Sequence, residues 1–430
     1  MIQRTFFIAA LLIARMTPAV DPPASSSTGT LSLRAAVAKA LSTRPEIAAA
    51  DQDLQAARDH EAVKRRAILP ELSVGLNAWR RSGQGGVADF ISATGTREYD
   101  YRVLAESTLW GGPRSGERRA ALAQRESREA QLMQTRAELA EQVAIAYYSE
   151  QAAEADSLAL EDSVAALSHY REMTQARLTH GAVAQIELSR AESRLAAEQA
   201  RLLERRAEVD RLRAQLAALT GLPEQEITPE SAPDSETAAW LSGDPSPARP
   251  GTEPALLVAQ AAARQAAGES TAERSNRLPR LSVSASYGID AEQIAGAPRG
   301  YQVGASLNIP VDIFGKQRLS FHEATATATA AQLRADATQL QLSTEEQNAL
   351  RVARSARSRY RLLLGALGGA DRSQEIAAKG YALGGMSALE VLDANQQRTD
   401  LRLGLHEARL TGELALVHLR ALLGLPVEGD

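Results

Sequence analysis

The sequence contains no cysteine and few aromatic residues, and both absences restrict what the protein can be. Without cysteine there can be no disulfide, no thiolate metal site, no cysteine nucleophile and no lipid anchor on an N-terminal cysteine. Phe, Trp and Tyr make up only 4% of the 430 residues, while Ala is abundant and charged residues alternate with Ala, Leu and Gln. This composition is typical of long helices that pack through thin interfaces rather than of several bulky cores.

The sequence also lacks a long apolar run, a strong net charge and a catalytic or metal-binding pattern. No stretch reaches the roughly 18 consecutive apolar residues of a membrane-spanning helix, so contact with a bilayer would require strands. The formal net charge of −5, with scattered Arg, predicts no nucleic-acid role. The six histidines, at positions 60, 169, 180, 322, 406 and 418, show no ligand spacing, and no Ser-His-acid set is found. We therefore expect neither an enzyme nor a cofactor.

The N-terminus has the order of a secretory signal peptide. Arg4 precedes a short apolar run at residues 6–13, and the small residues Thr-Pro-Ala follow at 17–19. We expect residues 1–19 to be removed as a signal peptide, with a disordered tail as the alternative. Residues 20–30 are expected to form a flexible lead-in, because they consist mainly of Pro, Ser, Thr and Gly.

The remainder of the chain is an internal duplication. Residues 45–74 align with residues 254–283 at a constant offset of 209, around the shared pattern Leu-Pro-x-Leu-Ser-Val. Farther along the offset is 203, and it pairs Gly181 with Gly384, Glu187 with Glu390 and Ala191 with Ala394. Chance would not hold one register over such a length. The domain prediction is a first structural repeat at 31–220, a Pro-rich inter-repeat linker at 221–253, a second structural repeat at 254–424 and a tail at 425–430.

Each repeat is predicted to contain a helix, a β-hairpin and two long helices. The hairpins fall at 71–109 and 280–311, where apolar residues alternate with small polar ones. The alternation is weaker around residues 99–105, because Leu104 interrupts the polar set. The long helices fall at 114–178 and 186–220 in the first repeat and at 316–380 and 387–423 in the second, since no Pro interrupts them. Leu or Val recurs every seven residues on the returning helices, which requires a partner helix. The positions are Leu188, Leu195, Leu202, Val209 and Leu216, and then Leu389, Leu403, Leu410 and Val417, with Gln396 interrupting.

The hairpins raise the question of a membrane. Strands of about ten residues with one apolar and one small-polar face have the pattern of membrane-spanning strands. Four strands cannot close a barrel, and open edges are not tolerated in lipid. Closure would need several chains, and three copies would supply twelve strands. Two soluble β-ribbons packed on helices are the alternative interpretation of the same alternation.

Several motifs resemble the TolC family of outer-membrane efflux proteins. They are YALGGMSALEVLDA at 381–394, the opening stretch at 31–50, Leu-Trp-Gly-Gly at 109–112 and Ile-Phe-Gly-Lys at 313–316. The resemblance implies a mixed α and β, helix-dominated fold with an internal duplication. It further implies a homotrimer in the outer membrane of a Gram-negative bacterium, in which a 12-stranded β-barrel, four strands per chain, continues into a long periplasmic α-helical barrel. The inter-repeat segment would contribute to an equatorial collar.

The family resemblance also implies a function, the exit duct of a tripartite efflux or type I secretion system. Such a duct works with a periplasmic adaptor (membrane fusion) protein and with an inner-membrane pump or ABC transporter that supplies the energy. The sequence does not distinguish a drug, a metal ion or a protein as the cargo. A periplasmic coiled-coil scaffold protein without a membrane barrel is the alternative function.

The working positions implied by the resemblance fall at the two helix turns. Glu390 and Asp393 match acidic rings at the tunnel entrance, with solvated surface acids as the alternative. Glu187 and Tyr381 match members of a latch that holds the entrance closed, and Met386 stands where the family has an arginine. Methionine makes no charged pair, so the closed state is expected to depend on Tyr381 and on helix packing. The adaptor-contact positions at the tips are Gly181, Ala182, Val183, Leu383, Gly384 and Ser387.

Overall fold

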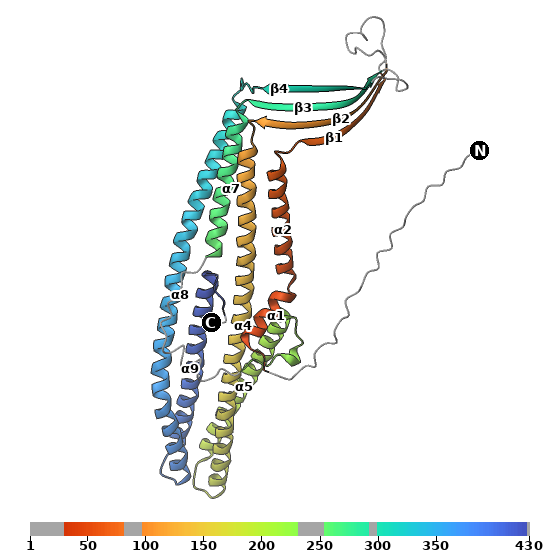
Figure 1. Cartoon of the computed structure of the whole chain (residues 1–430). Coiled ribbons are helices and arrows are strands. Elements are labelled where there is room, and N and C mark those ends of the chain that lie inside the picture. The colour runs from red at the N-terminus through yellow and green to blue at the C-terminus, as the bar shows by residue number, and fades with distance from the viewer. Residues whose placement is uncertain (1–29, 81–96, 231–252, 292–298, 428–430) are drawn as a thin grey trace, which may run out of the picture.

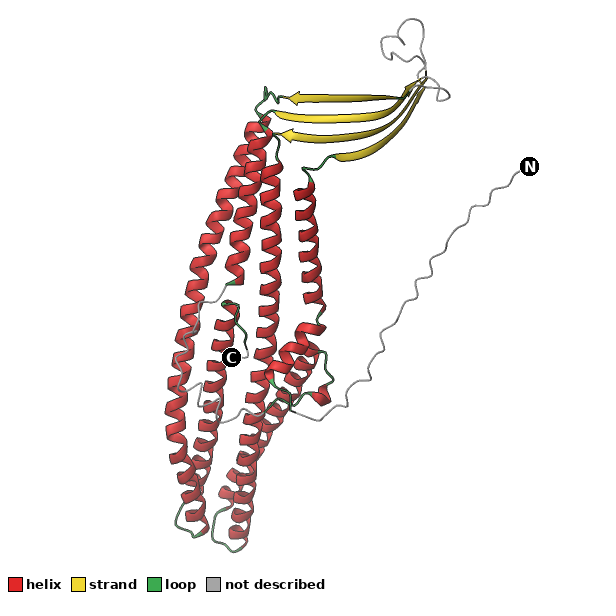
Figure 2. Cartoon of the chain, viewed as in Figure 1, coloured by secondary structure: helices red, strands yellow, loops and turns green. Residues whose placement is uncertain are grey.

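The computed structural model describes residues 30–80, 97–230, 253–291 and 299–427. The predicted signal peptide, nearly all of the lead-in and most of the inter-repeat linker therefore lie outside the described residues, as does the end of the predicted tail. Within the described ranges the chain is an elongated bundle of helices with one β-sheet at one end and two helix turns at the other (Figures 1 and 2). None of these helices combines the length and the apolar character that crossing a bilayer needs.

The order of elements follows the predicted duplication. The helices are α1 (Leu33–Thr43), α2 (Pro45–Arg66), α4 (Arg114–Thr179), α5 (Gln185–Thr220), α7 (Pro254–Asn276), α8 (Lys316–Ala382) and α9 (Ala388–Leu422), with a short 3-10 helix η1 at Glu224–Glu226. The strands are β1 (Glu71–Arg80), β2 (Arg97–Trp110), β3 (Arg280–Ala291) and β4 (Gly300–Asn308). A hairpin, a very long helix and a returning helix thus occur twice, as the sequence predicted.

The two longest helices set the length of the molecule. Helices α4 and α8 contain 66 and 67 residues, and at ~1.5 Å per residue each spans about 100 Å. Helix α5 returns along α4, and α9 returns along α8 (Figure 1). Helices α7 and α9 lie in line beside α8, with α7 nearer the sheet and α9 nearer the turns (Figure 1). Side chains on both sides of these helices stay exposed, because one chain cannot cover such a long, thin bundle.

The start of the first repeat differs from the prediction, because two helices and not one precede the hairpin. Ser32 caps α1, and its hydroxyl accepts a hydrogen bond from the backbone N–H of Ala35 at 3.3 Å. Pro45 then ends α1, since a proline disfavours helical geometry in the residue before it. Arg44 accordingly has φ −77° and ψ 127°, an extended conformation, and α2 begins with Pro45 at its first position.

The four strands form one antiparallel sheet in the order β1-β2-β3-β4. The register pairs Val74 with Val103, Val103 with Tyr287, and Tyr287 with Tyr301, so a single row crosses all four strands. Because side chains alternate along a strand, this register gathers the apolar set of every strand on one face. Most of the large apolar side chains on this face are exposed, Tyr301 to 83%. The opposite face carries mainly small polar residues on β1, β3 and β4, whereas β2 places Arg102, Leu104 and Glu106 there. The predicted alternation is confirmed, and so is its weakness on β2, where Leu104 lies among the polar residues.

The hairpin ends differ from the prediction in two places. The register of β2 on β3 shifts between Thr108 and Trp110, where a bulge adds a residue and pairs Trp110 with Leu281. The bulge therefore brings Trp110 onto the apolar face, which a regular strand would not do. Strand β4 ends at Asn308 and not at 311, because Pro310 has no N–H for the ladder.

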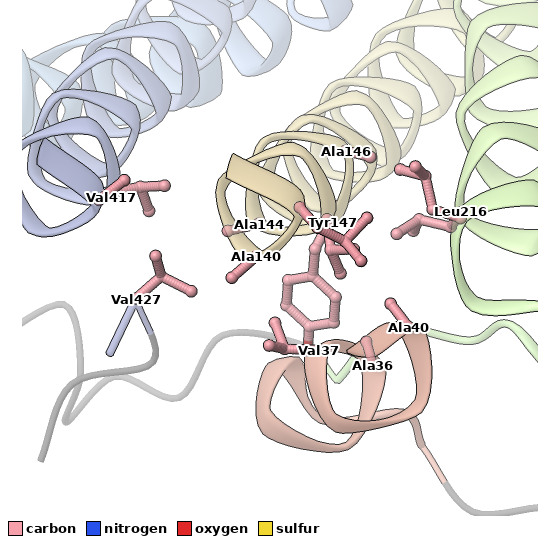
Figure 3. Packing of buried hydrophobic residues seen from close by; sticks show 14 of the residues in the cluster. Ala36, Val37, Ala40, Ala140, Ala144, Ala146, Tyr147, Leu216, Val417 and Val427 are labelled. Carbon is pink, nitrogen blue, oxygen red and sulfur yellow. The ribbon is translucent and has the colours of Figure 1, made fainter. Parts of the chain in front are cut away.

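The main core lies at mid-height of the bundle, where α1, α4, α5 and α9 meet (Figure 3). Tyr147 of α4 is buried there, and its hydroxyl donates to the Leu31 carbonyl at 3.0 Å and accepts from the Glu230 N–H at 3.1 Å. Leu31 also forms a parallel bridge with Pro229. The beginning of the first repeat and the first residues of the linker are thereby held against α4.

The heptad of the first returning helix is confirmed, and that of the second is only partly so. On α5 all five predicted positions are buried: Leu188, Leu195, Leu202, Val209 and Leu216. On α9 Leu389 is 55% exposed, whereas Val391 and Leu392 are buried. Helix α9 packs against α4 as well as α8, so its buried face is wider than a two-helix seam. The face extends to the polar residues Asn395 and Thr399, which a search for heptad leucines passes over.

Candidate functional site at the helix tips

The two helix turns lie next to each other at the end of the bundle opposite the sheet (Figure 1). Gly181 has φ +71° and Gly384 has φ +80°, a left-handed conformation that glycine adopts without strain. In both turns the residue after this glycine closes the helix, since Ala182 N–H donates to Arg177 O and Gly385 N–H donates to Gly380 O, each at 2.9 Å. The two turns therefore share one backbone design at the offset of 203 found in the sequence.

The helices that leave the two turns begin differently. The Ser387 hydroxyl caps α9 at the N–H of Glu390, and the Glu390 carboxylate accepts from the Ser387 N–H at 2.6 Å and from its hydroxyl at 2.9 Å. This reciprocal pair is a capping box. At the start of α5 the matching residue is Ala184, and it has no side-chain cap. The second turn is thus held more firmly than the first.

Behind the turns, an apolar cluster joins the two helix pairs. We call it the tip cluster, and its buried members are Leu167, Tyr170, Ala191, Leu195, Ala377, Tyr381, Ala388, Val391 and Leu392. Tyr381 is only 1% exposed. Its ring lies 4.9 Å from that of Tyr170, and its hydroxyl lies 3.1 Å from the Thr174 hydroxyl. Burial raises the pKa of the Tyr170 phenol well above its usual range. Tyr381 therefore connects α8 to α4 through a tilted ring contact and a buried hydrogen bond.

Arg177 is a second partner of Tyr381 that the sequence did not predict. Its Nη1 donates to the Tyr381 carbonyl oxygen at 2.8 Å, and its guanidinium carbon lies 4.7 Å from the centre of the Tyr381 ring. The arginine comes from the last turn of α4, in the first repeat, and not from the position of Met386. The only sequence signal was a basic residue in the last turn of a long helix, which is common and points to no particular partner.

Met386 and Glu187, two of the predicted latch residues, do not bond to Tyr381. Met386 folds over Gly380, where an added Cβ would lie 2.8 Å from the Met386 Cγ, and it packs on the tip cluster. Glu187 lies half-buried in the first turn of α5, near enough to Tyr170 to oppose its ionisation. Within the part of the chain that the structure describes, no side-chain hydrogen bond or ion pair is found for Glu187.

Glu390 and Asp393 lie on the exposed side of α9. They are three residues apart, so they share one helix face. The hydrogen bonds from the Ser387 backbone and hydroxyl hold the pKa of Glu390 below its ordinary value, and the carboxylate is therefore ionised at neutral pH. Glu390 thus has a local structural role in the cap, and this does not require it to lie in a ring.

The predicted adaptor-contact positions form the outermost surface of the two turns. Leu383 is 89% exposed, an unusual state for a leucine. Gly181, Ala182 and Gly384 are exposed, Val183 is half-buried, and the Ser387 side chain is engaged in the cap. The surface is small, largely uncharged and shaped mainly by backbone. Such a surface can accept the side chains of another helix closely.

Above the tips, polar pairs join α4 to α9. Asn395 donates to the Ser163 hydroxyl, which in turn donates to the buried Glu198 carboxylate of α5, both at 2.9 Å. Toward the sheet follow the pairs Arg402–Asp162 at 2.8 Å, His406–Asp156 at 2.9 Å and His418–Glu141 at 2.7 Å. A contact built from hydrogen bonds and ion pairs separates with less exposure of apolar surface than a packed one. Above the tip cluster, the interface between the two helix pairs is therefore more polar than the apolar heptad within the first pair.

Among the described ranges, no group of three or more His, Asp or Glu residues is arranged to hold a metal ion. The solved structures that resemble the chain include outer-membrane channels. The outer-membrane channel OprN is 21% identical, with a TM-score of 0.79 and a match over 92% of this chain and 90% of that one. VceC of Vibrio cholerae is 18% identical, with a TM-score of 0.78 over 91% and 96% of the two chains. The open state of the Neisseria gonorrhoeae MtrE channel is 20% identical, with a TM-score of 0.75 over 93% and 90%. At these identities the likeness shows a shared fold.

The family follows from the sequence match. No curated protein sequence is similar enough to count as a match. The sequence model of the family described as "Outer membrane efflux protein" matches residues 36–222 and 251–425, which correspond to the two repeats. The chain therefore belongs to the outer membrane efflux protein family.

Proposed function

We propose that three copies of this chain form the exit duct of a tripartite efflux or secretion system in the outer membrane. One observation carries the proposal, the sheet that exposes a continuous face of large apolar side chains on one side. An apolar face of this size would be unfavourable in contact with water, whereas it would be favourable in contact with the hydrocarbon of a membrane. The family, which is one of efflux channels, supports the same assignment.

The open edges of the sheet support a trimer. Strands β1 and β4 are the two edges, and each presents unpaired backbone groups. Lipid cannot satisfy such groups, so the edges have to pair with other copies. Three sheets of four strands would close a barrel of twelve, with the apolar faces toward the outer-membrane lipid and the small polar faces inward. The long helices would then form a tunnel through the periplasm.

The entrance of this tunnel would lie at the helix tips. In a trimer Glu390 and Asp393 would each form a ring of three carboxylates, which favours cations at a constriction. The contact of Arg177 with Tyr381, together with Thr174, would hold the two helix pairs together in the closed state. Glu187 and Met386 would contribute by packing near this latch. Opening would require α8 and α9 to move away from α4 and α5, across the polar pairs described above.

The partners would bind the outermost surface of the turns. Leu383 and the backbone around Gly384 and Gly181 fit the tip of a periplasmic adaptor protein, with Ala182, Val183 and Ser387 beside them. The adaptor would link the duct to an inner-membrane pump or ABC transporter. That pump would supply the energy for transport. The duct itself would only open and let the cargo pass.

The experiment is to express the full chain in a Gram-negative host and to fractionate the membranes. We expect it in the outer membrane, extractable only with detergent, as trimers that dissociate on heating and that conduct ions in a planar bilayer. A soluble periplasmic monomer without conductance would instead establish the alternative, a coiled-coil scaffold protein without a membrane barrel.

A further inference from the structure

The polar face of the sheet carries a charged pair that the proposed duct leaves without a role. Arg102 of β2 donates to the carboxylate of Asp100 through Nε at 2.6 Å and through Nη2 at 2.5 Å. Asn77 of β1 donates to the same carboxylate at 3.4 Å. Asp100 is only 7% exposed, although it lies on a sheet and not in a core. The two-point contact fixes both the position and the orientation of the guanidinium.

The residues in register with Arg102 on the other three strands are all glycines. They are Gly75 of β1, Gly288 of β3 and Gly300 of β4. Arg102 therefore has the only side chain in a row of four strands. Gly288 cannot easily be replaced, because a Cβ there would lie 2.0 Å from the Tyr101 carbonyl oxygen and 2.7 Å from the Arg102 Cα. The glycines leave space beside the Arg102 side chain, which is 40% exposed, whereas the Asp100 side chain beneath it is 10% exposed.

The alternation of the strands decides which way the pair faces. Arg102 and Asp100 lie on the face opposite to Tyr101 and Val103, which belong to the apolar face. Hydrocarbon excludes charged side chains from the lipid-facing side of a barrel, so the pair would face the lumen. Asp100 is near the start of β2, at the end of the sheet remote from the helices (Figure 1). In a barrel this end is the outer half.

We propose that Arg102 and Asp100 form a ring of three ion pairs in the outer half of the lumen, and that this ring determines how the duct discriminates cargo by charge. The inference rests on the proposed function, since one chain alone has no lumen. The ring is separate from Glu390 and Asp393, which lie at the other end of the molecule. Removing either charge of the pair changes the net charge of the ring by one per chain, in a known direction.

The test is the ion selectivity of purified trimers in a planar bilayer with a KCl gradient. Asp100→Asn removes one negative charge per chain, and Arg102→Gln removes one positive charge per chain. At ~0.1 M salt a charge acts over about 10 Å, so we expect the cation-to-anion permeability ratio to fall about twofold in the first variant and to rise about twofold in the second. The double variant and Arg102→Lys should both stay near the unmodified protein.

Ser286→Ala is the matched control, because Ser286 lies on the same face, one row from Arg102 and without charge. For each variant, assembly is checked by the presence of heat-sensitive trimers. Where a single variant does not assemble, Arg102→Lys and the double variant can still be measured. Conducting channels with the same permeability ratio in all variants would overturn the proposed role of the ring and would leave the proposed function unaffected. Absence of any conductance in the unmodified protein would instead overturn the proposed function.

Discussion

Arg177 of the first repeat contacts Tyr381 of the second at two points, the carbonyl oxygen at 2.8 Å and the ring face at 4.7 Å. The residues are 204 positions apart in the chain. Tyr381 is the last but one residue of α8, so the contact holds the end of that helix to the end of α4. A latch built on this contact would use an arginine, as the family resemblance implied, but one from the other repeat.

Replacing Arg177 by Ala should loosen this latch. A hydrogen bond from a charged donor contributes about 1.5–3 kcal/mol and a cation–π contact about 0.5–1 kcal/mol, and both are lower here because Arg177 is half-exposed. We expect a higher single-channel conductance at low voltage than in the unmodified protein. Arg171→Ala, on the same helix and paired only with the exposed Glu172, is the control. Equal conductance in the two variants would remove Arg177 from the latch.

Tyr381→Phe should keep the stacking on Tyr170 and lose only the bond to Thr174. The expected loss is about 1 kcal/mol of local stability, whereas Tyr381→Ala should lose about 3–5 kcal/mol because it also leaves a cavity. Hydrogen exchange of the backbone amides near the turns measures both effects. Similar exchange in the Phe and Ala variants would contradict a packing role for the ring.

The acidic residues of α9 require isosteric replacements. Glu390→Ala would remove the carboxylate half of the capping box, so a change in conductance could come from the altered cap alone. Glu390→Gln keeps the cap and, like Asp393→Asn, removes only the charge. We expect each variant to lower cation selectivity in bilayer recordings, and the double variant to lower it further. Unchanged selectivity would leave Glu390 with its capping role only.

His418 should make the contact of α9 with α4 dependent on pH. Its hydrogen bond to Glu141 raises its pKa above the ordinary value of 6.5, with further help from the charges of Glu141 and Glu345. Protonated His418 therefore stabilises the folded chain, fully below pH 6.5 and less as the pH rises through the raised pKa. His418→Gln should lower the melting temperature more at pH 6 than at pH 9, by an amount corresponding to less than about 1 kcal/mol. The exposed His322→Gln is the control, and an equal loss at both pH values would contradict the prediction.

Much of the fold could be predicted because it depends on local sequence patterns. Period two fixed the apolar face of the sheet, and the absence of Pro fixed the long helices α4 and α8. The sequence also held the Ser387–Glu390 capping motif, which would have shown that Glu390 has a local role. The prediction that Leu389 is buried was wrong, because a heptad pattern assumes one partner helix, whereas α9 packs on both α4 and α8.

The rest of the site depends on contacts between distant parts of the chain. Arg177 meets Tyr381 only after both long helices have folded back and packed together, and no spacing in the sequence reports that contact. The pairing of Trp110 with Leu281 depends on a bulge, which a regular alternation does not predict. In both cases the information lies in the packing of one repeat against the other.

The central claim, that sheets from different copies pair edge to edge, can be tested directly because the chain has no cysteine. Within one chain β1 and β4 are separated by two strands, about 14 Å at the usual strand spacing, which is too far for a disulfide. Pairs of cysteines are placed on β1 at Ser73 or Asn77 and on β4 at Gly304 or Ser306, and the outer membranes are oxidised. The account predicts that at least one pair yields covalent trimers that survive heating in detergent, while single-cysteine variants do not. Monomers only, for every pair, would contradict it.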